Sequence, residues 1–395
     1  MTRRAIIMVP GISRREQLAT RDQLVESIYY YSEGYATVTS DSKESSGFNY
    51  RTVTATSLEE NGEEVTLDVY EAFWGDLVPD WSKESPWQRF KHGLTLITYW
   101  ALGGLARSIA RREIPPRTSF AMVIAGLILI FWYLTVVTVL AKAIADGNSG
   151  MPDFINTYFV ENETGIWLLA KVKSLGAWPI FTFALLVLGM GRVESFANIA
   201  AFLKAYFRDD PINGSNVGLR AKSRKRVISV LNHVHQVAGE ADSADRYDEV
   251  FVVAHSLGGA IAVDALAEYG ANLATTTLIT RGSSLGALVQ QEPLIQHEIA
   301  KFYISKTRIS NWTDIVFTMD MMGSKVPIPR LSETGWSPKK HPPIFPPTQI
   351  PPLPKGQGFR MALIHEAYYR SERAILMLVR PVVSQPQPKV PAPNP

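Results

Sequence analysis

The segment DEVFVVAHSLGGAIAVDAL, residues 248–266, contains the residues best suited to chemistry. An apolar run typical of a buried strand leads through Ser256 into an alanine-rich run typical of a helix. A serine on such a turn is presented as a nucleophile, and the small residues Ala254 and Gly258 on either side let the backbone pass. The Leu257 amide would lie at the helix N-terminus, where unpaired donors favour an oxyanion. The pattern predicts a nucleophilic serine, and the alternative is a serine that only caps a helix.

This turn resembles that of the α/β-hydrolase superfamily, in particular of its lipase- and esterase-like members, in which the turn reads H-S-L-G-G. Ala254 replaces the first glycine of the usual G-x-S-x-G, which keeps a small residue there. The resemblance covers residues 5–75 loosely and 220–380 well. It implies an α/β fold with a mostly parallel sheet and helices on both faces. It also implies a serine, an acid and a histidine in that order along the chain. No cofactor and no metal are implied.

Three of the seven histidines follow Ser256 and are candidates for the base. His365 ends the apolar run FRMALI, which we interpret as a strand over 359–364, and it precedes a helical run. A loop at the carboxyl end of a strand is where the family places its base. His341 lies among prolines and His297 lies in a helix-like stretch, so we expect His365 to be the base.

The acid is expected in WTDIVFTMDMMG, residues 312–323, which resembles the family's segment that ends at the catalytic aspartate. Asp320 matches that aspartate. Asp314 is the rival, although it falls inside the strand-like run, where a polar residue is more often structural. By the same analogy, the turn after the first strand implies that Ile12 supplies the second oxyanion amide beside Leu257.

The rest of the chain alternates between strand-like and helix-like runs, which favours a mostly parallel α/β sheet. A hairpin is predicted from two runs, 52–58 and 63–70, that flank a turn-forming sequence. The other strands are expected at residues 5–9, 249–254, 276–280 and 308–317, with a helix over 257–269.

A central region differs in composition and predicts association with a membrane. Residues 119–141 contain no charge over 23 positions, which is long enough to cross a hydrocarbon core of about 30 Å. Residues 174–191 form a second uncharged run, interrupted by Pro179. We expect transmembrane helices at both runs and interpret residues 94–112 as an interfacial helix. The alternative is a buried hairpin or a hydrophobic lid.

The expected organisation follows from these segments, since the insert divides the α/β domain. The short flanks outside the two spans contain more arginines than the loop between the spans contains basic residues. By the positive-inside bias, this favours an integral membrane protein with a cytoplasmic catalytic domain. The expected parts are the first portion of the α/β-hydrolase domain at 1–89, the membrane insert at 90–192, the second portion at 193–380, and a proline-rich disordered tail at 381–395.

Composition excludes some classes of function. The formal net charge of +3 is far from the basic surface of nucleic-acid-binding proteins, and a chain without cysteine has neither disulfides nor a thiol nucleophile. The expected function is hydrolysis of carboxylic esters, lipid-like because the insert would place the domain at a bilayer. An acyltransferase using the same triad and a non-catalytic membrane scaffold are the alternatives. The sequence leaves the natural substrate and the oligomeric state open.

Overall fold

The computed structural model describes residues 2–12, 16–32, 36–38, 42–56, 64–78, 85–111, 116–145, 193–211, 216–239, 247–269, 273, 275–304, 308–317, 320, 322–329 and 361–379. The chain divides into two compact units. The first comprises Met1–Gly75, Lys225–Ser284 and Glu298–Pro395, and the second comprises Asp76–Arg224 and Leu285–His297.

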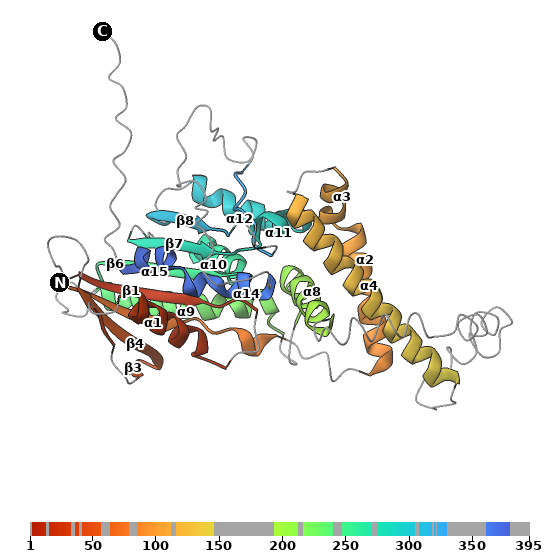
Figure 1. Ribbon diagram of the computed structural model, residues 1–395, viewed down its shortest axis with the longest axis horizontal. Helices are drawn as coiled ribbons and strands as arrows, with labels where there is room; N and C mark the ends of the chain where they lie inside the picture. Colours follow the sequence, from red (N-terminus) through yellow and green to blue (C-terminus); the bar gives the residue numbers. More distant parts are fainter. Residues whose placement is uncertain are drawn as a thin grey trace, which may run out of the picture. The chain divides into compact units, whose positions relative to one another are not determined.

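The first unit is built on an eight-stranded sheet with the order β2-β4-β5-β1-β6-β7-β8, with β3 paired to β4 (Figure 1). Pairing is parallel from β5 through β1, β6 and β7 to β8, and antiparallel among β2, β3, β4 and β5. The α/β expectation is therefore confirmed, with a mostly parallel sheet. The strands are β1 (Thr2–Val9), β2 (Ala36–Val38), β3 (Lys43–Ser45), β4 (Phe48–Thr56), β5 (Glu64–Glu71), β6 (Glu249–His255), β7 (Thr276–Arg281) and β8 (Asn311–Ile315).

Strand β1 lies at the centre of the sheet, between β5 and β6. Its residues Arg4–Val9 are all buried, as expected of a parallel strand covered on both faces. The one charge among them, Arg4, pairs with Glu249 at 2.6 Å and donates to the carbonyl oxygens of Leu378 and Val379. These carbonyls end a helix and lack partners within it, so Arg4 satisfies them while its own charge is neutralised.

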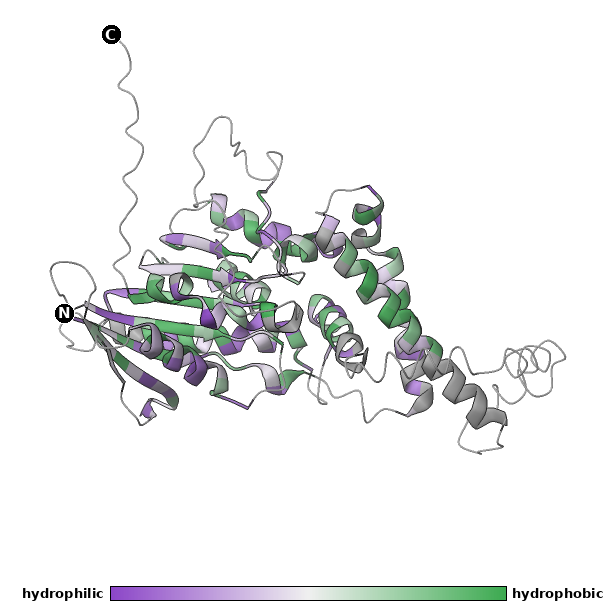
Figure 2. Ribbon diagram, in the orientation of Figure 1, coloured by the Kyte–Doolittle hydropathy of each residue, from purple (hydrophilic) through white to green (hydrophobic). Residues whose placement is uncertain are grey.

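Helices pack on the sheet through apolar side chains. Helix α1 (Ala19–Tyr31) contacts β4, β5 and α15 (Glu372–Val379), and α10 (Gly258–Tyr269) contacts β1 and β6. Figure 2 shows hydrophobic residues along the central strands, and the main core joins Ile6, Val253 and Ile279 to apolar residues of α1 and α15. This unit also contains α14 (Met361–Glu366) and the 3-10 helix η3 (Ala367–Arg370).

The predicted hairpin is confirmed. Strands β4 and β5 pair antiparallel, with Thr54 opposite Thr66. The strand predicted at 308–317 is present as the shorter β8, and the strands predicted at 249–254 and 276–280 are β6 and β7.

The described residues of the second unit are mainly helical. Helix α2 begins with a capping box, in which the Ser85 hydroxyl accepts from the Gln88 amide and the Gln88 side chain accepts from the Ser85 amide. Leu96, Leu129, Ala200 and Ala201 form its core, from three helices that contact one another. Its helices are α2 (Pro86–Leu102), α3 (Gly104–Ala110), α4 (Pro116–Ala145), α8 (Val193–Arg208) and α11 (Leu285–Gln291). Three elements have residues in both units, because the division along the chain falls within them. They are α9 (Leu219–Gly239), α12 (Pro293–Ile304) and the 3-10 turn η1 (Gly75–Leu77).

Helix α4 contains the run expected to cross a membrane at 119–141. It presents a row of exposed large apolar side chains, namely Phe120, Val123, Ile124, Leu127, Ile130 and Leu134. Their spacing of three and four residues puts them on one face, with the buried Leu129 on the other. Within the part of the chain that the structure describes, however, no helix has the length and apolarity needed to cross a bilayer. The second expected span, 174–191, and the tail, 381–395, lie outside the described residues.

Candidate active site

Ser256 occupies a sharp turn between β6, which ends at His255, and α10, which begins at Gly258. Its backbone has φ 54°, in the left-handed region that costs an L-residue roughly 1–2 kcal/mol. Its amide donates to the carbonyl of Arg281 at 3.0 Å, which ties the turn to the neighbouring strand. A nucleophile on a strained strand-to-helix turn is what the sequence pattern predicted at this position.

Glycine at position 258 is required by close approach of the chain. A Cβ atom there would clash with the carbonyl oxygens of Val9 and Pro10, so the start of α10 lies directly against the end of β1. This confirms the expectation that the residue two positions after Ser256 must be small. The Leu257 amide precedes the helix and has no acceptor among the residues that the structure describes. It is therefore available to an oxyanion.

The turn after β1 lies beside Ser256. A Cβ atom on Gly11 would be 2.9 Å from the Cβ of Ser256. The buried Trp74 donates from Nε1 to the Pro10 carbonyl at 2.9 Å and so holds this turn from the other side. Ile12 is the next residue, and its role as a second oxyanion donor stays a prediction.

His365 contacts Ser256 directly. Its Nε2 atom lies 2.8 Å from Ser256 Oγ, and both side chains are buried. The strand expected at 359–364 is wrong over its described part, because residues 361–366 form helix α14. Met, Ala and Leu are strong helix formers, and an apolar run of six residues does not distinguish a strand from a buried helix. His365 therefore projects from a helix rather than from a loop after a strand.

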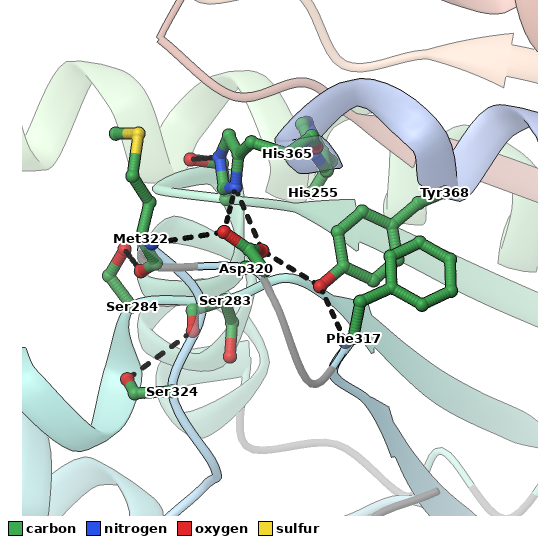
Figure 3. Close-up of polar contacts among 10 residues, drawn as sticks. His255, Ser283, Ser284, Phe317, Asp320, Met322, Ser324, His365 and Tyr368 are labelled. Atoms are coloured by element: carbon green, nitrogen blue, oxygen red, sulfur yellow. Dashed lines mark hydrogen bonds and ion pairs between the residues drawn. The ribbon is translucent and has the colours of Figure 1, made fainter. Parts of the chain in front are cut away.

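Asp320 completes the cluster (Figure 3). Its two carboxylate oxygens lie 3.1 and 3.0 Å from His365 Nδ1, and Oδ1 accepts from the Met322 amide at 2.9 Å. The rival, Asp314, is engaged elsewhere, since it accepts from the Thr280 hydroxyl at 2.7 Å and from the Val326 amide at 3.1 Å. Of the two aspartates, the structure therefore brings only Asp320 to His365.

Electrostatics favour an ionised acid. Burial opposes the charge of Asp320, but hydrogen bonds from His365, the positive charge that His365 takes up and a hydrogen bond from Tyr368 outweigh it, so the pKa of Asp320 is lowered. An ionised carboxylate only accepts, so Nδ1 of His365 carries the proton facing it. In a neutral imidazole, Nε2 then has a free lone pair that accepts from the Ser256 hydroxyl. This is the arrangement of a general base on a serine.

Two further residues of the cluster were not predicted to touch it. Tyr368 donates to Asp320 Oδ2 at 2.8 Å, and the His255 Nε2 lies 2.8 Å from the carbonyl oxygen of His365. A carbonyl can only accept, so His255 is the donor. The His255 ring thus bonds to the backbone of His365 and not to Ser256. Burial first, and the nearby charge of His365 second, lower the pKa of His255 to about 3. Residues three apart on a helix lie on the same face. If a helix had been expected here, the spacing between His365 and Tyr368 would have indicated that Tyr368 lies near the site.

Two serines that follow β7 contact the segment after Asp320. Ser284 donates to the carbonyl of Met322 at 2.9 Å, and Ser283 accepts from the Ser324 amide through its carbonyl. Both contacts fix the segment after Asp320. His297 is part of α12, and His341 lies outside the described residues. Among the residues described, no three His, Asp or Glu side chains form a group that could hold a metal ion.

Comparison with known proteins gives no family. No family model matches this chain, and no curated protein or solved structure matches it either. The geometry of Ser256, His365 and Asp320 is therefore the basis on which a function can be proposed.

Proposed function

We propose that this chain is a serine hydrolase of the α/β-hydrolase type that cleaves carboxylic esters. The observation that carries the proposal is the continuous contact from Ser256 Oγ to His365 Nε2 at 2.8 Å and from His365 Nδ1 to Asp320. These residues come from three separate parts of the chain. The strained turn that exposes Ser256 supports the same interpretation, because strain in a backbone persists where the surrounding structure enforces it.

The proposed reaction has two halves. Ser256 Oγ attacks the ester carbonyl carbon while its proton passes to His365 Nε2, and the Leu257 amide stabilises the oxyanion. The carbonyl re-forms as the bond to the alcohol oxygen breaks, and His365 returns the proton to that oxygen. Water then attacks the acyl-enzyme, again giving a proton to His365, which passes it to Ser256 as the acid leaves. Asp320 stabilises the imidazolium throughout and stays ionised.

Labelling with a fluorophosphonate probe tests this proposal, because such a probe reacts with activated serines. The purified wild type is expected to be labelled and to hydrolyse p-nitrophenyl esters, whereas Ser256→Ala and His365→Ala lose both properties. Folded wild type that is neither labelled nor active would favour a non-catalytic scaffold. Labelled protein that releases the acyl group only to an added alcohol would favour an acyltransferase.

We further propose lipid-like esters as substrates and a lipid surface as a partner. The apolar face of α4 supports this, since six large apolar side chains are exposed in one row. An exposed apolar row of this kind is suited to contact with the acyl chains of a lipid surface.

A further inference from the structure

We propose that Tyr368 is a positioning residue that holds the acid of the proposed triad in place and keeps it ionised. This inference rests on the proposed function and deepens it, since it extends the chain of contacts from Ser256, His365 and Asp320 to a fourth side chain. Tyr368 lies on η3, three residues after His365, and is fully buried.

The direction of its hydrogen bonds is fixed by chemistry. The Phe317 amide lies 3.0 Å from the Tyr368 hydroxyl oxygen, and an amide N–H can only donate to it. The hydroxyl proton is then left for Asp320 Oδ2, 2.8 Å away. The hydroxyl is therefore a relay that accepts from the backbone at one side and donates to the carboxylate at the other (Figure 3).

The ring of Tyr368 is held as firmly as its hydroxyl. It stacks on Phe317 with ring centroids 4.2 Å apart. On another side it meets Gly282, which has φ 55° and where a Cβ atom would press on both the ring and Asp320. The hydroxyl is also kept protonated, because burial first and the charge of Asp320 second raise the pKa of Tyr368. It is therefore a donor at neutral pH.

The consequence concerns the charge on Asp320. A carboxylate buried this deeply would otherwise gain a proton, and the bond from Tyr368 is one of those that lower its pKa. Tyr368 also lies on η3, which directly follows the helix α14 that carries His365, so two consecutive elements position the acid and the base. Loss of the hydroxyl should thus disturb the pairing of Asp320 with His365 without removing either residue.

The test is Tyr368→Phe, which keeps the stacked ring and removes only the hydroxyl. The matched control is Tyr247→Phe, because the Tyr247 hydroxyl likewise donates to a buried carboxylate, that of Asp68, at 3.0 Å, and contacts Tyr70. Both variants are compared with wild type for kcat, KM and the pH dependence of kcat/KM on a p-nitrophenyl ester, and for thermal stability.

We expect Tyr368→Phe to lower kcat/KM by roughly 10- to 100-fold, the range for a lost hydrogen bond to a charged group. The loss should fall on kcat, and the acid limb of the pH profile should move to higher pH, because without the Tyr368 hydrogen bond the carboxylate of Asp320 holds a proton on the Asp320–His365 pair more strongly. Tyr247→Phe should lose stability with neither change. An active Tyr368→Phe with an unshifted acid limb would overturn the inference, whereas an unlabelled, inactive wild type would overturn the proposed function instead.

A second measurement covers the case in which Tyr368→Phe does not fold. Fluorotyrosine incorporated at position 368 keeps the shape of the side chain and makes its hydroxyl a stronger donor. The acid limb should then move to lower pH relative to wild type. An unchanged limb would contradict a role for this hydroxyl.

Discussion

The backbone of Ser256 lies at φ 54°, a conformation that glycine adopts without cost and other residues do not. The turn is nevertheless kept, because its amide is bonded to the Arg281 carbonyl and the next residues are pressed against the end of β1. The side chain that does the proposed chemistry is thus a source of strain at its own position.

A pair of substitutions separates this strain from activity. Both Ser256→Gly and Ser256→Ala should abolish ester hydrolysis. Glycine removes a left-handed penalty of roughly 1–2 kcal/mol and adds an entropic cost of about 0.5–1 kcal/mol, so Ser256→Gly should be the more stable of the two by about 1 kcal/mol. Urea unfolding measures the difference, and an alanine variant as stable as the glycine variant would contradict the strain.

A buried neutral histidine gives the site a second dependence on pH. Burial lowers the pKa of His255 to about 3, below its unfolded value near 6.5, so the unfolded chain binds protons first as pH falls. The stability it contributes is complete above about pH 6.5 and decreases as pH falls toward 3.

Replacing His255 by glutamine should therefore flatten this part of the stability profile. Glutamine keeps an N–H donor for the His365 carbonyl and does not titrate in this range. We expect the variant to lose less stability than wild type between pH 6.5 and pH 4, as followed by thermal unfolding. Parallel losses in the two proteins would show that His255 does not control this range.

At the scale of elements, the sequence predicted the pieces that depend on local patterns. The strand, Ser256 and the helix after it follow one another within a single run, so periodicity and turn chemistry suffice to identify them. Asp320 and His365 were chosen because the family order along the chain is serine, acid, histidine, and the contact between the two side chains is consistent with that choice. Helix α14 was mistaken for a strand because the short, mostly apolar run 359–364 has no decisive period.

Contacts that depend on the tertiary fold could not be predicted in this way. Trp74 follows β5, and nothing in its neighbourhood along the chain indicates that its indole reaches the Pro10 carbonyl. The same holds for Tyr368 and the Phe317 amide, which are 51 positions apart. Such bonds are set by how strands and helices pack, which a single sequence does not reveal.

The turn after β1 should depend on Trp74. Trp74→Phe keeps a buried ring but leaves the Pro10 carbonyl without its donor, which loosens the turn beside Ser256. If this turn supplies an oxyanion donor, kcat should fall by about tenfold or more while KM changes little. Steady-state kinetics measure the effect, and an unchanged kcat would indicate that the turn takes no part in stabilising the oxyanion.

At the scale of the whole molecule, the sheet unit holds the proposed chemistry and the helical unit holds the exposed apolar face of α4. Each unit has its own core. The α/β class followed from the alternation of elements, whereas the extent of the helical unit did not, since it gathers segments from two separate parts of the chain.

A flotation assay tests the proposed lipid partner with the full chain. Wild type is expected to float with phosphatidylcholine vesicles, and Leu127→Glu combined with Ile130→Glu should remain in the dense fraction, because buried charge is costly in the acyl layer. Tyr30→Glu, at an exposed aromatic residue on α1, is the control and should float like wild type. Equal flotation of all three proteins would refute the assignment to α4.

The central position of β1 also has a consequence for synthesis on the ribosome. Its residue Arg4 pairs with Glu249, 245 positions later, and donates to the Leu378 carbonyl, 374 positions later. One side of the strand therefore has no partner strand while Asp76–Arg224, the first segment of the helical unit, is translated. The proposed base follows the nucleophile by 109 residues, so a nascent chain carries Ser256 well before it can activate it. The proposed catalytic activity should therefore appear late in translation and in a single step.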